Sequence, residues 1–311
     1  MRTRFTWVAR GAAVLLLGAG ACTAPRNITT SGKVTPQGEF RVAYNQGFNV
    51  ATAPLSEAGS AVRAAASQFS DSVADGKRVR YTGLVNRVQT AAIAYLLDPV
   101  QTSADLSIRY GVVPRLDVGY KYALGSHVFD TQYQFMGSTG SIEHPGRGAE
   151  GGATYGSVGL QFAFQRAKLP GIPFLGDVND LVGFDARRHD LIIPVTFSTA
   201  LGPEETIGAF SYGVVYAHSW LSYSLTPRNL YYNTGALVPE LPQQTHGYSS
   251  YGAFANLKLG YKYVYVVPAL SIYYQNYGRF TLLDGSSASL SGFTFIPSIG
   301  LQARIPSFKS R

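Results

Sequence analysis

The stretch Leu106–Phe135, LSIRYGVVPRLDVGYKYALGSHVFDTQYQF, decides the fold class of this chain. Apolar and polar residues alternate through it in three runs, which are interrupted at Pro114 and between Leu124 and Phe129. A period of two predicts β-strands with one apolar and one polar face. Strands of roughly 9–11 residues with this pattern build membrane-spanning β-barrels, but antiparallel sheets on a soluble core alternate in the same way.

The same alternation recurs along most of the chain. It appears in seven further segments, at residues 38–52, 158–165, 190–199, 209–220, 251–262, 266–277 and 293–305. Together with the three runs above, this predicts an all-β fold, an antiparallel up-and-down transmembrane barrel of about ten strands. Even strand numbers are the rule in bacterial barrels, so eight and twelve remain open.

The composition favours a barrel over a soluble domain. Charged residues make up 14% of the chain, against roughly 25% in typical soluble domains. Beyond the N-terminus no stretch approaches the ~20 apolar residues of a membrane helix, so a membrane-spanning form must close its sheet. The net charge of +8 is not clustered, which argues against a nucleic-acid partner and is sufficient for attraction to anionic lipids.

The N-terminal segment 1–21 is predicted to be a signal peptide. Three arginines precede a short apolar run, followed by Ala19-Gly20-Ala21-Cys22. This end resembles the cleavage site of bacterial lipoproteins, with Ala19 where leucine is more common, and it also fits an ordinary signal-peptidase site. The resemblance implies lipidation of Cys22, including palmitate, by lipoprotein-processing machinery. Cys22 is the single cysteine of the chain, and the polar residues 22–37 are predicted to tether it to a barrel domain at 38–308.

The final strand, Ser298–Ile305, resembles the C-terminal signal of outer-membrane β-barrels, although the chain continues through Pro306–Arg311. The resemblance implies a Gram-negative outer-membrane protein and recognition by barrel-assembly machinery. It also implies contact with outer-membrane lipids and lipopolysaccharide. We therefore expect a periplasmic N-terminus and extracellular loops.

Loop lengths support that orientation, because short turns at 113–114, 200–206 and 261–264 fall at one end, and long loops at 53–103, 166–187, 222–247 and 278–291 fall at the other. Two connections do not follow this pattern: the short link 125–128 falls at the end with the long loops, and the long link 137–155 falls at the end with the short turns. The largest interruption, residues 55–101, is rich in alanine and partly helical in pattern. It is predicted to be either an extracellular cap, which we favour slightly, or a plug in the lumen.

The sequence contains no catalytic, metal or cofactor motif that fits its spacing rules. His218 and Ser219 are adjacent on a predicted strand, so they would point to opposite faces and could not act together directly. The candidate site is instead a set of charges predicted to face the lumen: Arg41, Arg109, Asp117, Lys121, Asp130, Lys258, Lys262 and Arg304, with Asp190 beside them.

These charges would either form salt bridges that fill a narrow barrel or line a porin-like, anion-preferring passage. The function expected is a structural or surface role, with such a pore as an addition. The alternatives are an outer-membrane lipid-modifying hydrolase and a soluble periplasmic β-rich lipoprotein.

Overall fold

The computed structural model describes residues 26–53, 79–80, 86, 89–90, 93–94, 97–123, 125–167, 183–228, 230–232 and 234–307. The predicted signal peptide, Cys22 and most of the 55–101 insert lie outside these residues, as do Leu84 and Val88 of its predicted apolar helix face.

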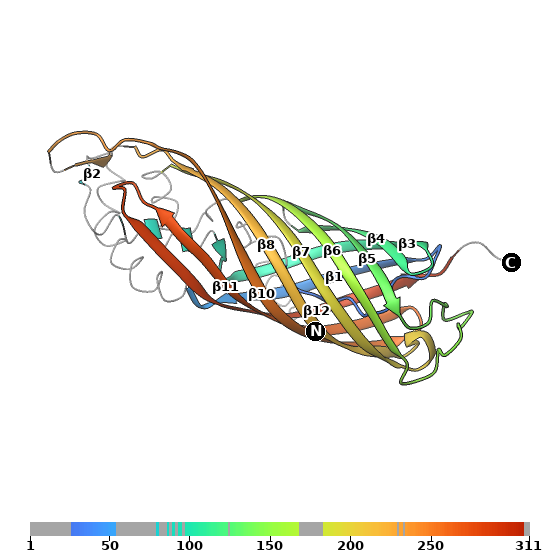
Figure 1. Ribbon diagram of the computed structural model, residues 1–311. Coiled ribbons are helices and arrows are strands. Elements are labelled where there is room, and N and C mark those ends of the chain that lie inside the picture. Colours follow the sequence, from blue (N-terminus) through green and yellow to red (C-terminus); the bar gives the residue numbers. More distant parts are fainter. Residues whose placement is uncertain are drawn as a thin grey trace, which may run out of the picture.

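The described residues form a closed antiparallel barrel of ten strands (Figure 1). Each strand pairs with its neighbours in sequence, and β1 closes the barrel against β12. The barrel strands are β1 (Phe40–Ala51), β3 (Gln101–Val113), β4 (Leu116–Ala123), β5 (Ser126–Met136), β6 (Thr154–Ala167), β7 (Phe184–Leu201), β8 (Gly208–Leu225), β10 (Leu241–Tyr261), β11 (Val264–Thr281) and β12 (Ser287–Ile305). A parallel pair, β2 (Val79–Arg80) and β9 (Leu230–Tyr231), lies apart from the barrel sheet. The predicted all-β, antiparallel up-and-down barrel and its strand number are confirmed.

The two ends of the barrel differ in their connections. The short-turn end carries the links 114–115, 202–207 and 262–263, together with the C-terminal end of β12. At the other end, which we call the loop end, β1, β6 and β8 end, and the next barrel strand begins much further along the chain (Figure 1). The exceptional long link at 137–153 does lie at the short-turn end, where Glu143 and the main chain of Gly146 contact barrel residues. The loop expected at 222–247 is shorter, since β8 and β10 extend into it.

The barrel wall has apolar residues outside and polar residues inside. Large side chains stay exposed along the outer face, as Phe129 (55%), Val214 (61%) and Tyr251 (62%) show. The buried inner face carries amides, hydroxyls and charges, among them Gln132, Gln275 and Arg109. The period of two therefore separates the two faces as the sequence predicts, with the order of a soluble protein reversed.

Three described residues of the insert lie inside the loop end of the barrel. Ile93, Ala94 and Leu97 are helical and buried. They belong to one hydrophobic cluster with inward-facing wall residues such as Tyr223 and Tyr277. These three residues therefore lie within the mouth of the barrel. For this described part of the insert, the position is that of a plug and differs from the extracellular cap that the sequence slightly favoured.

Candidate functional site: a lumen occupied by the N-terminal segment

Residues 26–37, which we call the plug segment, run along the inside of the barrel. At the loop end Arg26 lies 2.9 Å from Asp98. At the short-turn end Gln37 forms a bridge with Gly111 of β3. Ile28 is 1% and Thr35 0% exposed. The described part of the predicted tether is thus enclosed by the barrel, a difference from the spacer role expected from its polar sequence.

The plug segment is extended, and side chains of the wall satisfy its main chain. A buried N–H or C=O without a partner is costly, so an extended segment in a lumen requires such donors and acceptors. The wall supplies them at several levels. These contacts are Gly32 N to Ser198 Oγ (3.0 Å), Val34 N to Gln134 Oε1 (3.1 Å), Thr35 N to Asp117 Oδ2 (2.7 Å), Gln132 Nε2 to Ser31 O (2.8 Å) and Asn256 Nδ2 to Thr30 O (3.1 Å).

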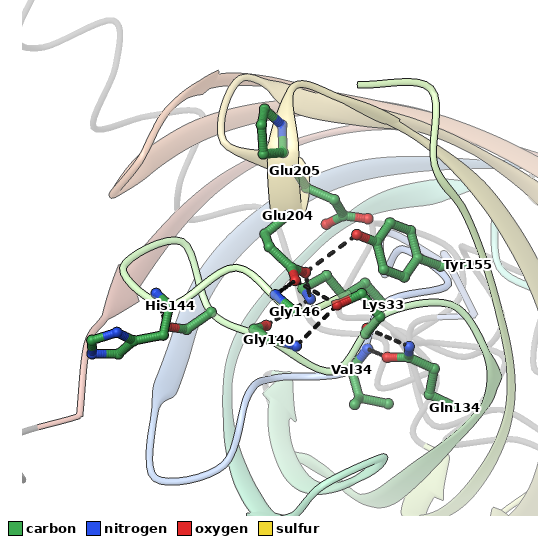
Figure 2. Close-up of polar contacts among 12 residues, drawn as sticks. Lys33, Val34, Gln134, Gly140, His144, Gly146, Tyr155, Glu204 and Glu205 are labelled. Carbon is green, nitrogen blue, oxygen red and sulfur yellow. Dashed lines mark hydrogen bonds and ion pairs between the residues drawn. The ribbon is translucent and has the colours of Figure 1, made fainter. Parts of the chain in front are cut away.

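Lys33 anchors the plug segment at the short-turn end (Figure 2). Its ammonium pairs with the Glu204 carboxylate, donates to Gly140 O at 2.8 Å and lies 5.0 Å from the centre of the Tyr155 ring. Glu204 also accepts from the Tyr155 hydroxyl at 3.2 Å and from Gly146 N at 2.8 Å. Burial alone would raise the pKa of Glu204, but Lys33, the Ser138 hydroxyl and Gly146 N outweigh it and hold the pKa below its usual 4.5.

Glu204 and its neighbour Glu205 occupy an unusual backbone conformation. Their φ angles are +51° and +61°, a region that non-glycine residues enter at a cost of about 1–3 kcal/mol each. Glu205 pairs with Lys258 and accepts from the Ser31 hydroxyl of the plug segment at 3.0 Å. The turn between β7 and β8 is therefore held in a strained form that points two carboxylates at the plug segment.

Arg26 anchors the other end. Besides Asp98, its guanidinium contacts the Gln275 side chain and lies 5.3 Å from the centre of the Tyr273 ring. The Tyr273 hydroxyl donates to Arg26 O at 2.6 Å. Asp98 in turn accepts from the Tyr277 hydroxyl at 3.1 Å. The plug segment is thus fixed by one cation at each end.

Most of the predicted lumen charges lie inside the barrel and have partners. Arg41 donates to the plug carbonyls of Lys33 (2.9 Å) and Val34 (3.1 Å). The remaining pairs are Arg109 with Asp117 (2.5 Å) and Asp130 (2.7 Å), Lys258 with Glu205, Arg304 with Glu39 (2.6 Å) and Glu143, and Arg188 with Asp190 (2.7 Å). Lys121 is buried at 6% exposure beside Asn27, Arg109 and Asp130.

Lys262 differs from the prediction. It lies in the turn between β10 and β11, half-exposed, and its ammonium is 5.2 Å from the centre of the outward Tyr261 ring. Because β10 ends at Tyr261, the alternation of faces does not extend to Lys262, and its side chain does not face the lumen.

Five buried carboxylates that the alternation did not predict change the charge balance of the lumen: Glu39, Asp98, Asp105, Glu204 and Glu205. Among the described residues, eight acids are buried: Glu39, Asp98, Asp105, Asp117, Asp130, Asp190, Glu204 and Glu205. Outside the plug segment the buried bases are Arg109, Lys121, Arg188, Lys258 and Arg304, with Arg41 half-buried. Arg26 and Lys33 of the plug segment therefore bring the cations to the same number as the acids.

Two cavities that lie in the lumen between described residues are small. A cavity beside Lys33 and Lys258 measures about 10 Å³, and one beside Asn27 and Lys121 about 20 Å³. A single water needs about 10–15 Å³ of such volume. These two spaces could each hold about one water and do not amount to a passage.

His218 and Ser219, the adjacent pair expected to point to opposite faces, lie on opposite sides of the barrel wall. Ser219 is buried and hydrogen-bonded to Asp190 and Arg188 inside the barrel. His218 points outward, where its Nδ1 is 3.1 Å from the hydroxyl of Ser249 on β10. A second serine from a neighbouring strand, invisible to sequence spacing, is therefore the one within reach of this histidine.

Comparisons with known proteins give similarity to solved structures alone. No protein-family model matches the chain, and no curated protein matches it. Ail of Yersinia pestis is 8% identical with a TM-score of 0.29, and neisserial surface protein A is 8% identical with 0.31; each match covers 86% of this chain and 99% of the other. The translocator domain of the autotransporter NalP from Neisseria meningitidis is 7% identical, with a TM-score of 0.33 and coverage of 96% and 95%. Scores of this size do not establish a shared family or activity.

Two further surveys concern the described residues. They contain no group of three or more histidine, cysteine or acidic side chains placed to hold a metal ion. They also contain no helix with the length and hydropathy needed to cross a membrane.

Proposed function

We propose that this protein is an outer-membrane β-barrel lipoprotein that is closed by its own N-terminal segment and acts at the cell surface, without an open channel. The observation that carries the proposal is the course of residues 26–37 through the lumen, with Lys33 and Arg26 paired to Glu204 and Asp98. Placement in the membrane is supported by the exposed apolar outer face, which would promote aggregation of a soluble periplasmic protein.

The same observation bears on where a lipid anchor would lie. Arg26 is level with Gln275, eleven residues along β11 from its first residue, Val264. Eleven residues of a strand tilted by about 40° rise about 28 Å. Cys22 is four residues before Arg26, and four residues span at most about 14 Å. Acyl chains on Cys22 would thus enter the leaflet at the loop end, in place of the periplasmic N-terminus expected from the sequence.

Planar-bilayer recordings test the closed state. The full-length protein is expected to give no conductance steps, and a variant lacking residues 26–35 is expected to give steps. Because that deletion removes two cations from the balanced lumen, the opened barrel should prefer cations, the reverse of the anion preference considered from the sequence. Steps of equal size from both proteins would refute the role of the plug segment.

A second candidate function rests on the contact between His218 and Ser249. A histidine nitrogen 3.1 Å from a serine hydroxyl has the geometry of a base and its nucleophile. The pair lies on the lipid-facing side beside Trp220 and Tyr251, so its substrate would be a lipid ester. Fatty-acid release from lipid vesicles by the wild type, with loss in Ser249→Ala and not in Ser222→Ala, would support a hydrolase. No release by the wild type would remove this candidate.

A further inference from the structure

The outer face of the barrel carries a cationic cluster where β5, β6 and β7 approach the loop end. Arg166 and Arg187 are directly opposite each other in the β6–β7 register, and both are exposed. Two register positions nearer the short-turn end, Phe164 is opposite His189 on one side and His127 on the other. The four basic side chains line one cavity of about 500 Å³ together with Phe164.

The charges of this cluster are not compensated within the described residues. No ion pair joins either arginine to an acid there, although Asp185 lies on the same face of β7. Like charges directly opposite each other on neighbouring strands are destabilising. An anion bound outside the sheet, between the two guanidinium groups, would remove this cost.

The surroundings of the cluster select the kind of anion. On the side toward the short turns, Phe129 and Phe164 are 55% and 40% exposed on the same outer face. The site thus has guanidinium groups above an aromatic surface, which suits a molecule with a phosphate head and acyl chains. A soluble anion would gain nothing from the aromatic part.

We infer that Arg166 and Arg187, with His127 and His189, bind the phosphate group of a lipid in the leaflet at the loop end. In the orientation proposed above, that leaflet is the outer one, and the ligand class is a phosphomonoester glycolipid of the lipid A kind. The inference rests on the proposed function, because the cluster meets lipid only if the barrel spans a membrane.

Native mass spectrometry of the full-length protein in detergent tests the site. Protein titrated with diphosphoryl lipid A is expected to retain it, and protein titrated with phosphatidylcholine is not. A charged hydrogen bond is worth enough to change affinity by about tenfold, so Arg166→Gln and Arg187→Gln should each weaken retention by about that factor. Arg279→Gln, an exposed arginine of β11 outside the cluster, is the matched control and should retain lipid A as the wild type does.

Three outcomes would overturn the inference. These are equal retention by the double Arg166→Gln/Arg187→Gln variant, equal loss in the Arg279→Gln control, and full displacement of lipid A by millimolar inorganic phosphate, which would indicate a soluble ligand. Arg166→Lys/Arg187→Lys keeps the charge and should retain partial binding, which separates a ligand effect from misfolding. If the barrel fails to insert into bilayers, the proposed function fails first; if it inserts and the variants bind normally, only this inference fails.

Discussion

Replacing Glu204 by glutamine should loosen the plug segment by a predictable amount. Lys33 is 2% exposed, and its charge would remain buried without the carboxylate. Removing one member of a buried ion pair costs about 3–5 kcal/mol. Glutamine keeps one oxygen for the ammonium, so we take the lower value, which corresponds to an increase of about 100-fold in the population with the plug segment detached at Lys33.

The assay is the rate of maleimide labelling of a cysteine introduced at Val34, in a Cys22→Ser background. Val34 is 3% exposed, so labelling requires detachment and its rate follows the detached population. Glu204→Gln should raise the rate about 100-fold. The exposed Glu150→Gln in the 137–153 link serves as control and should leave the rate unchanged.

The double variant Lys33→Met/Glu204→Gln decides whether the ion pair is the cause. Replacing a buried pair with uncharged groups of similar size is often neutral, so the double variant should label close to the wild-type rate. A double variant that labels as fast as Glu204→Gln, or a single variant that labels as slowly as the wild type, would refute the anchoring role of Lys33.

Three further predictions concern the same end of the barrel. Since the pKa of Glu204 is lowered in the folded protein, its stabilising contribution is complete above 4.5 and is lost as the pH falls through the lower folded value. Labelling at Val34, divided at each pH by the labelling rate of the urea-unfolded protein because the thiolate fraction itself falls with pH, should therefore increase below pH 4.5. Arg304→Gln removes the guanidinium that contacts the 137–153 link, so trypsin should cleave that link faster in a time course on gels. Gly111→Ala would place a Cβ 2.0 Å from the Pro36 carbonyl oxygen, and the urea midpoint of its gel-mobility transition should fall, by about 1–3 kcal/mol in stability.

The strands could be predicted from the sequence because one face of each strand carries apolar side chains and the other carries polar ones. Residues such as Leu106, Ile108 and Tyr110 therefore alternate with polar residues over a whole strand. The alternation gave all ten strands but not their ends, since β10 begins at Leu241, among polar residues that resemble a loop. Lys262 was misplaced for the same reason, because periodicity does not show where a strand turns.

The plug segment could not be predicted from periodicity, because its fixed position depends on contacts with at least seven different strands. Its composition carried one signal: Arg26 and Lys33 are the cations that balance buried acids elsewhere in the chain. Asp98 directly precedes Pro99, where a predicted helix would end, and Glu204 and Glu205 fall in the predicted short turn 200–206. Their burial follows from barrel closure, which pairs residues up to 265 positions apart, as Glu39 and Arg304 are.

The plug segment is continuous with β1, the strand that closes the barrel. At Gly38, whose φ is +80°, the chain reverses from the lumen into the wall, and β1 then pairs with β12. The plug segment is therefore attached to the strand that closes the barrel. It can enter the lumen laterally while β1 pairs with β12 to form the closing seam. No end-on passage through a finished ring is needed. During refolding, protection of residues 26–35 from proteases should consequently arise together with seam formation, and a delay between the two would indicate late insertion.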